Sequence, residues 1–366
     1  MQDTVFSPAF GNKPATLVGR SQDMQRLEEG LLSAPGSKER ARLIIGQRGL
    51  GKTVLLLELA EYARKNGYIV ASPTIVSKGM LERILEKLEK DSERYFTQKP
   101  ARITGGTVGA LGFTAGIQTE TAQKPKRSFA YRLQEICEKA AAYHKGILIL
   151  VDEVQASDDE LKELIIAYQE MVGEAQNIAV VFAGLPAAVS RMLSQHVLTF
   201  LNRASKLDLR PISINEVEIF FHSSFDKLGI SVPDPWIREA AEATEGSPYM
   251  MQLVGHYITI CASDRGGLPE KSFQQALAYA REEFFNDICG ATLAPLSEKD
   301  IEFLKAMAED DAQSTVKDLG VRLRASSAYI QRYKARLLQT GIIANNRWGV
   351  VTFAVPYLKE YLRTLV

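Results

Sequence analysis

The chain has 366 residues, 46% of them hydrophobic, and 44 basic residues balance 44 acidic ones. This length suits two or three domains, and the zero net charge argues against nucleic-acid binding over the whole surface while leaving a local basic patch open. No apolar run reaches the roughly 18 residues of a membrane span, and no signal peptide precedes the first helix, so we expect a cytoplasmic protein without membrane contact. Cys137, Cys261 and Cys289 are too far apart to predict a disulfide framework or a zinc site.

The segment GQRGLGKT fits the phosphate-binding pattern G-x-x-x-x-G-K-[ST]. The apolar run ARLII precedes it, and VLLLELAEYARKNG follows with helical spacing and a glycine stop. A strand, a glycine loop and a helix N-terminus together point backbone N–H groups at a phosphate. We therefore expect ATP to contact Gly46, Gln47, Arg48, Gly49, Leu50, Gly51, Lys52, Thr53 and Val54, with Lys52 on the β- and γ-phosphates and Thr53 on Mg²⁺.

A second carboxylate element lies in KGILILVDEVQ, where five apolar residues run directly into Asp152 and Glu153. An unbroken apolar strand is typical of the middle of a parallel sheet, and ligands bind where such strands end. Asp152 is the expected Mg²⁺ contact, and Glu153 is the expected catalytic base for water. The pair favours ATP hydrolysis over transfer of the phosphoryl group to a small molecule.

One further segment lies between these two motifs, and another follows the second motif. Residues 101–127 are rich in Gly, Thr and Ala and predict either a flexible insertion or a partner-facing loop with a basic edge at Lys124, Lys126 and Arg127. Residues 213–288 contain four helical stretches and predict an all-helical lid. A break rich in Gly and Pro is expected at residues 290–295.

The last seventy residues predict three helices, a β-hairpin and a closing helix, which is the order of a winged helix-turn-helix. Ser297 and Asp300 begin the first helix with a near capping box, and Asn345, Asn346, Arg347 and Gly349 are the expected turn of the hairpin. Seven basic residues and one acidic residue lie between 317 and 347, a local net charge of +6. We expect double-stranded DNA to contact Arg324, Ser327, Tyr329, Gln331, Arg332, Lys334, Arg336 and Arg347. The alternative is a protein-binding winged helix whose basic residues face solvent.

The segment PATLVGRSQDMQRLEEGL at residues 14–31 resembles the N-terminal box of AAA+ ATPases of the origin-recognition and archaeal, STAND-like groups. IAVVFAGLP resembles their sensor-1 strand, and EGSPYMMQLVGHYI resembles the lid helix that carries sensor 2. The resemblance implies an α/β P-loop core with a parallel sheet, a helical lid and a C-terminal winged helix. We divide the chain accordingly into residues 1–212, 213–289 and 290–366.

The resemblance also implies roles for single residues. Val18 and Gly19 would line the adenine pocket, Pro248 would approach the nucleotide from the lid, and Arg203 would be an arginine finger reaching a neighbouring subunit of a homo-oligomer. The sequence departs from the family at Gly184 and Tyr249, where a polar sensor 1 and an arginine sensor 2 are usual. We therefore expect slow hydrolysis or switch-like use of ATP.

Three functions are compatible with these features. The first is a DNA-associated ATPase that couples ATP binding and hydrolysis to assembly on DNA. The second is a nucleotide-gated signalling or defence switch of the STAND type that acts through protein partners, although no long repeat sensor follows in the sequence. The third is a DNA-binding regulator with a vestigial ATPase, against which the intact Lys52, Thr53, Asp152 and Glu153 argue.

Overall fold

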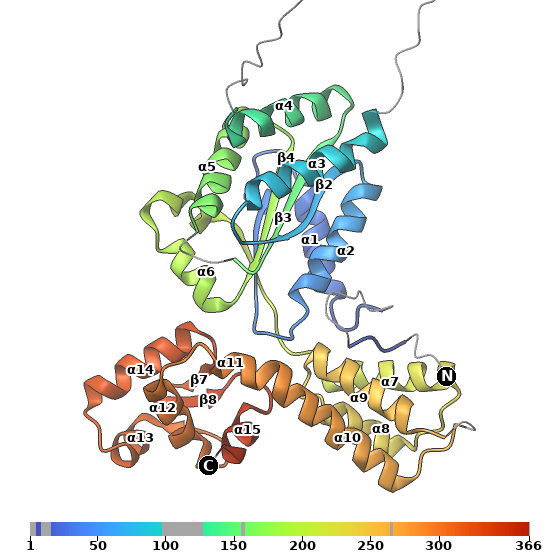
Figure 1. Ribbon diagram of the computed structural model, residues 1–366, viewed down its shortest axis with the longest axis vertical. Coiled ribbons are helices and arrows are strands. Elements are labelled where there is room, and N and C mark those ends of the chain that lie inside the picture. Colours follow the sequence, from blue (N-terminus) through green and yellow to red (C-terminus); the bar gives the residue numbers. More distant parts are fainter. Residues whose placement is uncertain (1–4, 9–15, 97–126, 155–157, 264–265, 366) are drawn as a thin grey trace, which may run out of the picture.

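A five-stranded parallel sheet forms the centre of the upper half of the molecule (Figure 1). The computed structural model describes residues 5–8, 16–96, 127–154, 158–263 and 266–365. The strand order is β2-β3-β4-β1-β5, and every neighbouring pair is parallel, as the buried apolar runs predict. The strands are β1 (Ala41–Ile45), β2 (Tyr68–Ile75), β3 (Gly146–Asp152), β4 (Ile178–Gly184) and β5 (Ser205–Asp208).

Helices cover both faces of this sheet, and each face has its own apolar core. Leu55 and Leu59 of one helix layer pack with Ile44 and Leu148 on one face. The other face packs against a second layer that includes Leu164. The first layer holds α1 (Ser21–Leu32) and α2 (Lys52–Lys65); the second holds α3 (Met80–Phe96), α4 (Phe129–Ala142) and α5 (Asp159–Gly173). The short elements η1 (Lys38–Arg40), α6 (Pro186–Leu193) and η2 (His196–Arg203) complete this half.

Four helices form the predicted lid below the sheet. Two of them, the first and the third, begin with a serine cap, because the Ser213 and Ser247 side chains accept hydrogen bonds from backbone N–H groups of the first turn. Within the lid, the last two helices pack against each other more extensively than any other pair. The lid consists of α7 (Ile214–Leu228), α8 (Asp234–Glu242), α9 (Pro248–Cys261) and α10 (Glu270–Phe284).

An N-terminal residue that the sequence analysis passed over joins this lid. Phe6 is 2% exposed and lies against Phe220, with ring centroids 5.7 Å apart in an edge-on arrangement. The Ser7 backbone N–H donates to Gln252 Oε1 at 2.9 Å. Phe6 and Ser7 are therefore anchored in the lid rather than in the sheet that follows them in sequence.

The C-terminal body contains three helices, a small antiparallel sheet of order β6-β8-β7 and a closing helix. Ser297 and Asp300 form a complete capping box at the first of these helices, as the sequence predicts. The elements are α12 (Glu298–Ala308), β6 (Ser314–Thr315), α13 (Val316–Arg322), α14 (Ser327–Gln339), β7 (Ile343–Arg347), β8 (Val350–Phe353) and α15 (Leu358–Thr364).

Two local predictions in this region are only partly right. Helix α10 continues through η3 (Phe285–Gly290) and α11 (Ala291–Leu293), so no break follows Gly290 and the chain leaves the helix only before Pro295. The hairpin turn is formed by Trp348 and the predicted Gly349, because residues 345–347 still belong to β7, in which Asn345 and Arg347 pair with β8. The strand tolerates Asn345 because it is an exposed edge strand with a bulge before Arg347.

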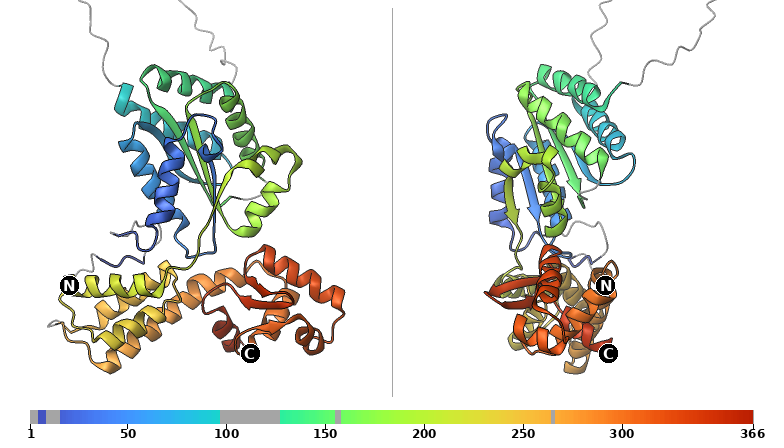
Figure 2. Two further views of the ribbon diagram at one scale, coloured as in Figure 1. Left: turned by 180° about the vertical axis from the view of Figure 1, so that it is seen from behind. Right: turned by 90° about the vertical axis from the view of Figure 1, so that its left-hand side faces the viewer.

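The lid and the C-terminal body lie side by side beneath the sheet (Figures 1 and 2). They share one continuous apolar core, in which Phe284 of the lid lies edge-on to Tyr357, and the Tyr357 hydroxyl donates to the Ala243 carbonyl at 2.6 Å. The division at residues 212/213 and 289/290 stays a prediction. Residues 97–126 fall outside the described part, including all of the predicted insertion except Arg127. Within the described residues, no helix is both long and apolar enough to cross a membrane.

Candidate active site

The glycine loop connects the end of β1 to the start of α2, at the carboxyl edge of the sheet. Gly49 and Gly51 have φ values of +77° and +82°, in the left-handed region that favours glycine. Helix α2 begins at Lys52, so its N-terminal N–H groups open toward the loop. This strand–loop–helix geometry is the predicted one and suits an anionic phosphate.

Lys52 folds back over the loop. Its Nζ donates to the Gly46 carbonyl at 2.9 Å and to the Gln47 carbonyl at 2.7 Å. Burial lowers the pKa of Lys52 to about 8, and Arg48 lowers it further while Asp152 and Glu153 oppose the shift. A phosphate bound in the loop would compete with these two carbonyls for the ammonium group and would stabilise its charged form.

Thr53 and Asp152 meet across the loop, although 99 residues separate them in sequence. Thr53 Oγ1 donates to Asp152 Oδ2 at 2.6 Å, and the Glu153 backbone N–H donates to Asp152 Oδ1 at 2.9 Å. No group of three or more His, Cys, Asp or Glu residues is arranged for a metal among the described residues. Nucleotide-bound Mg²⁺ needs only one or two protein oxygens beside phosphates and waters, so the adjacent hydroxyl and carboxylate fit this ion.

Glu153 follows β3 with φ +52°, an uncommon conformation for a residue with a side chain. The next residue, Val154, is buried, and its N–H donates to the Ala183 carbonyl of the neighbouring strand at 3.0 Å. This bond fixes the backbone on one side of Glu153, while the Glu153 side chain itself is exposed at the sheet edge. Strained backbone of this kind concentrates at functional sites and suits the predicted role as a base for water.

The two positions where the resemblance predicts sensors, Gly184 and Tyr249, carry other groups. A Cβ atom at Gly184 would lie 2.4 Å from Val154 Cγ2, so no polar side chain fits there. The Tyr249 hydroxyl donates to Asp287 Oδ2 at 2.5 Å inside the lower half of the molecule, and burial together with this bond raises the pKa of Tyr249. Neither residue directs a charged or amide side chain at the loop.

Residues 16–181, which contain the loop and both carboxylates, match the family described as the AAA ATPase domain. This match covers 166 of the 366 residues and defines the AAA domain of the chain. The AAA domain makes the chain an ATPase. Residues 286–362 match a second family, described as a domain of unknown function (DUF8462). No curated protein sequence matches the chain significantly.

Solved structures share the fold over nearly the whole chain. The Walker-type ATPase paby2304 of Pyrococcus abyssi has a TM-score of 0.68 at 16% identity, and the match covers 95% of this chain and 96% of that one. The ORC2 protein of Aeropyrum pernix, solved in ADPNP–ADP complexes, has a TM-score of 0.66 at 16% identity, with 98% and 96% covered. Cdc6p of Pyrobaculum aerophilum has a TM-score of 0.52 at 16% identity, with 100% and 98% covered. The fold is therefore that of archaeal origin-recognition-like AAA+ proteins.

The lid packs directly on the phosphate loop of the AAA domain. The Tyr249 backbone N–H donates to the Gly49 carbonyl at 3.4 Å, and Pro248, the first residue of α9, lies beside Gly51. Val18 packs against the lid core, and Gly19 has φ +65° at the approach of the chain to α1. Val18, Gly19 and Pro248, the three residues that the resemblance predicts at the nucleotide, therefore lie around the boundary between the AAA domain and the lid.

Arg20 is a buried residue of the AAA domain that the sequence analysis did not single out. It is 5% exposed, and its Nη2 donates to the Leu50 carbonyl of the phosphate loop at 3.2 Å. Asp23 accepts from Arg20 Nη1 at 3.3 Å, whereas Arg20 Nε has no hydrogen-bond partner in the structure. Arg20 is the last residue of the LVGR segment. The sequence shows only an arginine next to a predicted helix start, which does not indicate a contact with the phosphate loop.

Arg203 ends η2, just before the edge strand β5. Its side chain is exposed, and the strand beside it has no further neighbour in the sheet. This position is accessible to another molecule. The arginine-finger role stays a prediction, as do the roles of the loop, lid and C-terminal residues.

The predicted DNA-binding residues are distributed over the α13–α14 turn, α14 and the hairpin. Tyr329 and Lys334 are half-buried, and Arg332 lies over the Tyr333 ring with its guanidinium 5.0 Å from the ring centroid. Arg336 pairs with the fully buried Asp300 at 3.1 Å. The exposed members are Arg324, Ser327, Gln331, Arg332, Arg336 and Arg347.

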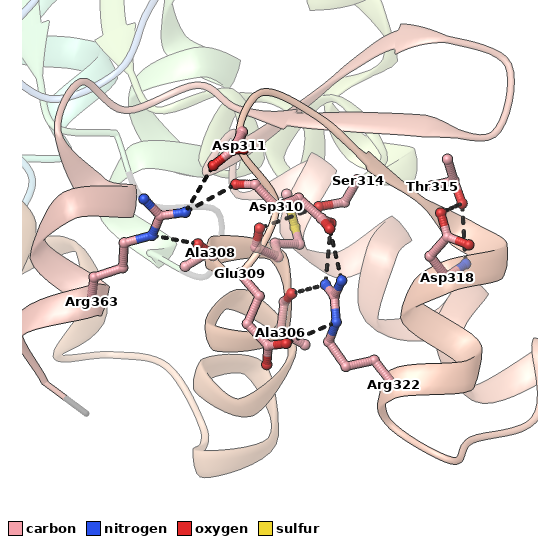
Figure 3. Close-up of polar contacts among 11 residues, drawn as sticks. Ala306, Ala308, Glu309, Asp310, Asp311, Ser314, Thr315, Asp318, Arg322 and Arg363 are labelled. Atoms are coloured by element: carbon pink, nitrogen blue, oxygen red, sulfur yellow. Dashed lines mark hydrogen bonds and ion pairs between the residues drawn. The ribbon is translucent and has the colours of Figure 1, made fainter.

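The local charge of +6 is partly neutralised by acidic residues outside the counted segment (Figure 3). Arg322 pairs with Asp310 at 2.7 Å and with Glu309 at 3.1 Å, and it also donates to the Ala306 carbonyl. The hydrogen bond from Arg322 and the ion pair lower the pKa of Asp310. Arg322 is thus a structural residue of the C-terminal body rather than part of a free basic surface.

The end of α14 contacts the phosphate loop itself. Gln47 Nε2 donates to the carbonyl of Gly341, the residue two positions after the last residue of α14. Gly341 is buried, has φ +67° and lies beside Pro186 at the start of α6. The nucleotide-binding loop and the last helix of the helix-turn-helix order are therefore linked through one side chain.

Proposed function

We propose that this ATPase uses ATP and Mg²⁺ to control its assembly on double-stranded DNA through the C-terminal body. The contact between Gln47 and Gly341 carries this proposal, because it joins the loop that would hold the phosphates to the end of α14. Lys52 donates to the backbone carbonyl of the same Gln47. Phosphate binding would draw Lys52 away from the Gln47 carbonyl. That shift would change the position of Gln47 and, with it, the hydrogen bond from Gln47 to Gly341.

The architecture of the C-terminal body supports a winged helix as the DNA-binding unit. Helices α13 and α14 are joined by four residues, 323–326, a turn length typical of helix-turn-helix motifs. The second helix of such a motif enters the major groove, and the following hairpin reaches the flanking backbone or minor groove. Ser327, Gln331 and Arg332 on the exposed side of α14 would contact the duplex. Arg324 and Arg347 would neutralise phosphates at its edges.

The chemistry at the loop would follow from the residues described above. Mg²⁺ would neutralise charge that develops on the transferred phosphoryl group, with Thr53 and Asp152 as its protein ligands. Lys52 would hold the β- and γ-phosphates, and Glu153 would accept a proton from the attacking water. Arg203 would act on the nucleotide of a neighbouring copy in a homo-oligomer. The lack of side-chain sensors at Gly184 and Tyr249 supports a slow cycle.

Duplex binding by the full chain tests the DNA part of the proposal. The logarithm of the affinity should fall linearly with the logarithm of the salt concentration, because bound cations of the DNA are released. Arg332→Ala should weaken binding and reduce the magnitude of the slope by about 1 if Arg332 contacts a phosphate. Fluorescence anisotropy of a labelled duplex over a salt series measures both quantities.

Lys271→Ala is the matched control, since it removes one exposed positive charge from α10 in the lid. It should leave the slope unchanged. Absence of duplex binding at low salt would contradict the DNA proposal. In that case the alternative, a slow nucleotide switch acting through a protein partner, would be favoured by the missing sensor side chains at Gly184 and Tyr249.

A further inference from the structure

The tip of the β7–β8 hairpin presents a tryptophan to solvent. Trp348 is 100% exposed, whereas Val321, the next most exposed large apolar side chain in the described part of the chain, is 73% exposed. Figure 2 shows the small sheet at the surface of the C-terminal body. A large aromatic side chain usually buries most of its surface, so the ordered turn offers a complete indole face to a binding partner.

The turn that carries Trp348 is tied to the rest of the body. The Val316 N–H, at the start of α13, donates to the Gly349 carbonyl at 3.0 Å. Thr315 of β6 pairs with Val350 on the other side of the turn, and Gly349 takes φ +75°. The tip is already held in place by these contacts. Binding of a partner to the indole would therefore cost little conformational entropy in the hairpin.

The surroundings of the indole are basic. Arg347 precedes it in sequence, and Lys317 follows the residue that is bonded to the tip; both side chains are exposed. Asp318, the acidic residue beside Lys317, accepts from the Thr315 hydroxyl at 2.7 Å as part of the cap of α13. An exposed aromatic face on a turn that also carries exposed cations matches the combination of flat bases and phosphates in a nucleic acid.

We propose that Trp348 stacks on a nucleic-acid base whose face is exposed, at a junction between duplex and unpaired DNA. Inside an intact duplex, neighbouring base pairs cover each base face, and insertion between them costs unstacking energy. An unpaired base offers its face without that cost. This inference rests on the proposed DNA function: α14 would hold the duplex while the hairpin, part of the same body, would contact the first open base.

Tryptophan fluorescence tests the stacking directly, because the chain contains only two tryptophans. Trp236 lies in the lid, stacked on Phe273 with ring centroids 5.0 Å apart, and Trp236→Phe leaves Trp348 as the single reporter. Adding a duplex with an unpaired thymidine tail should quench the Trp348 emission strongly. Emission that stays constant while anisotropy shows binding would overturn the inference and leave the proposed DNA function intact.

Affinity measurements on the wild type and two variants complete the test. Trp348→Ala should weaken binding to the tailed duplex about tenfold or more, in line with the stacking of one base, and should change binding to the blunt duplex much less. Trp348→Phe should restore most of the difference, because it keeps an aromatic face. Equal losses on both DNAs would overturn the inference alone, and absence of binding to either DNA would overturn it together with the proposed function.

Discussion

Lys52→Ala is expected to weaken ATP binding by about a hundredfold, which is the loss for removing a half-buried, charged hydrogen-bond donor. Lys52 lies over the phosphate loop and donates to the Gly46 and Gln47 carbonyls. Its substitution would remove the ammonium group that the loop holds where a phosphate would bind. Titration with a fluorescent ATP analogue in the presence of Mg²⁺ measures the effect.

Lys65→Ala provides the control for this substitution. Lys65 is exposed at the other end of the same helix, α2, so the variant removes an equal charge far from the loop. Its ATP affinity should equal that of the wild type. An unchanged affinity in Lys52→Ala would contradict the assignment of the loop as the nucleotide site.

Glu153→Gln is expected to reduce ATP hydrolysis by about a hundredfold to ten-thousandfold, the usual range for loss of a general base. Glutamine keeps the size and exposure of the side chain but cannot accept the proton of the attacking water. ATP affinity should change little, because Thr53 and Asp152 remain in place. Phosphate release during steady-state turnover and analogue titration together separate the two effects.

Glu174→Gln serves as the matched control, since Glu174 is an exposed acidic residue beyond the far end of α5. It should hydrolyse ATP at the wild-type rate. Hydrolysis by Glu153→Gln at the wild-type rate would contradict the role of Glu153 as the base. The strained backbone at Glu153 would then require another explanation.

The features that sequence predicts best are those encoded by short stretches of chain. The glycine loop, the β3 strand with its two carboxylates and the capping box at Ser297 depend on residues within a few positions of one another. Their neighbours in sequence determine the backbone geometry, so pattern and structure agree. Parallel pairing of the apolar strands then brings Thr53 and Asp152 within 2.6 Å.

Features that depend on distant contacts were not predictable in the same way. Gln47 and Gly341 are 294 residues apart, and nothing near Gly341 indicates more than the end of a helix. The pairing of Arg322 with Asp310 likewise depends on how α13 packs against α12. A charge count within one segment therefore overestimates the free positive charge, because it omits acidic partners from other elements.

The structure also explains why one departure from the family pattern cannot be repaired by a single substitution. Gly184 lies so close to Val154 that any side chain would require Val154 to move. Val154 in turn anchors the backbone beside Glu153 through its hydrogen bond to Ala183. The glycine and the conformation of the predicted base are therefore structurally linked.

The effect of ATP on DNA affinity tests the central claim, that the phosphate loop and the C-terminal body are coupled through Gln47. Duplex anisotropy is measured for the full chain with ATP, with ADP and without nucleotide, using wild type and Gln47→Ala, with ATP affinity determined alongside. The account predicts that ATP changes the duplex affinity of the wild type by about fivefold or more, a typical allosteric coupling. In Gln47→Ala that change should largely disappear although ATP still binds. Equal duplex affinity with and without ATP in the wild type, or an undiminished ATP effect in Gln47→Ala, would contradict it.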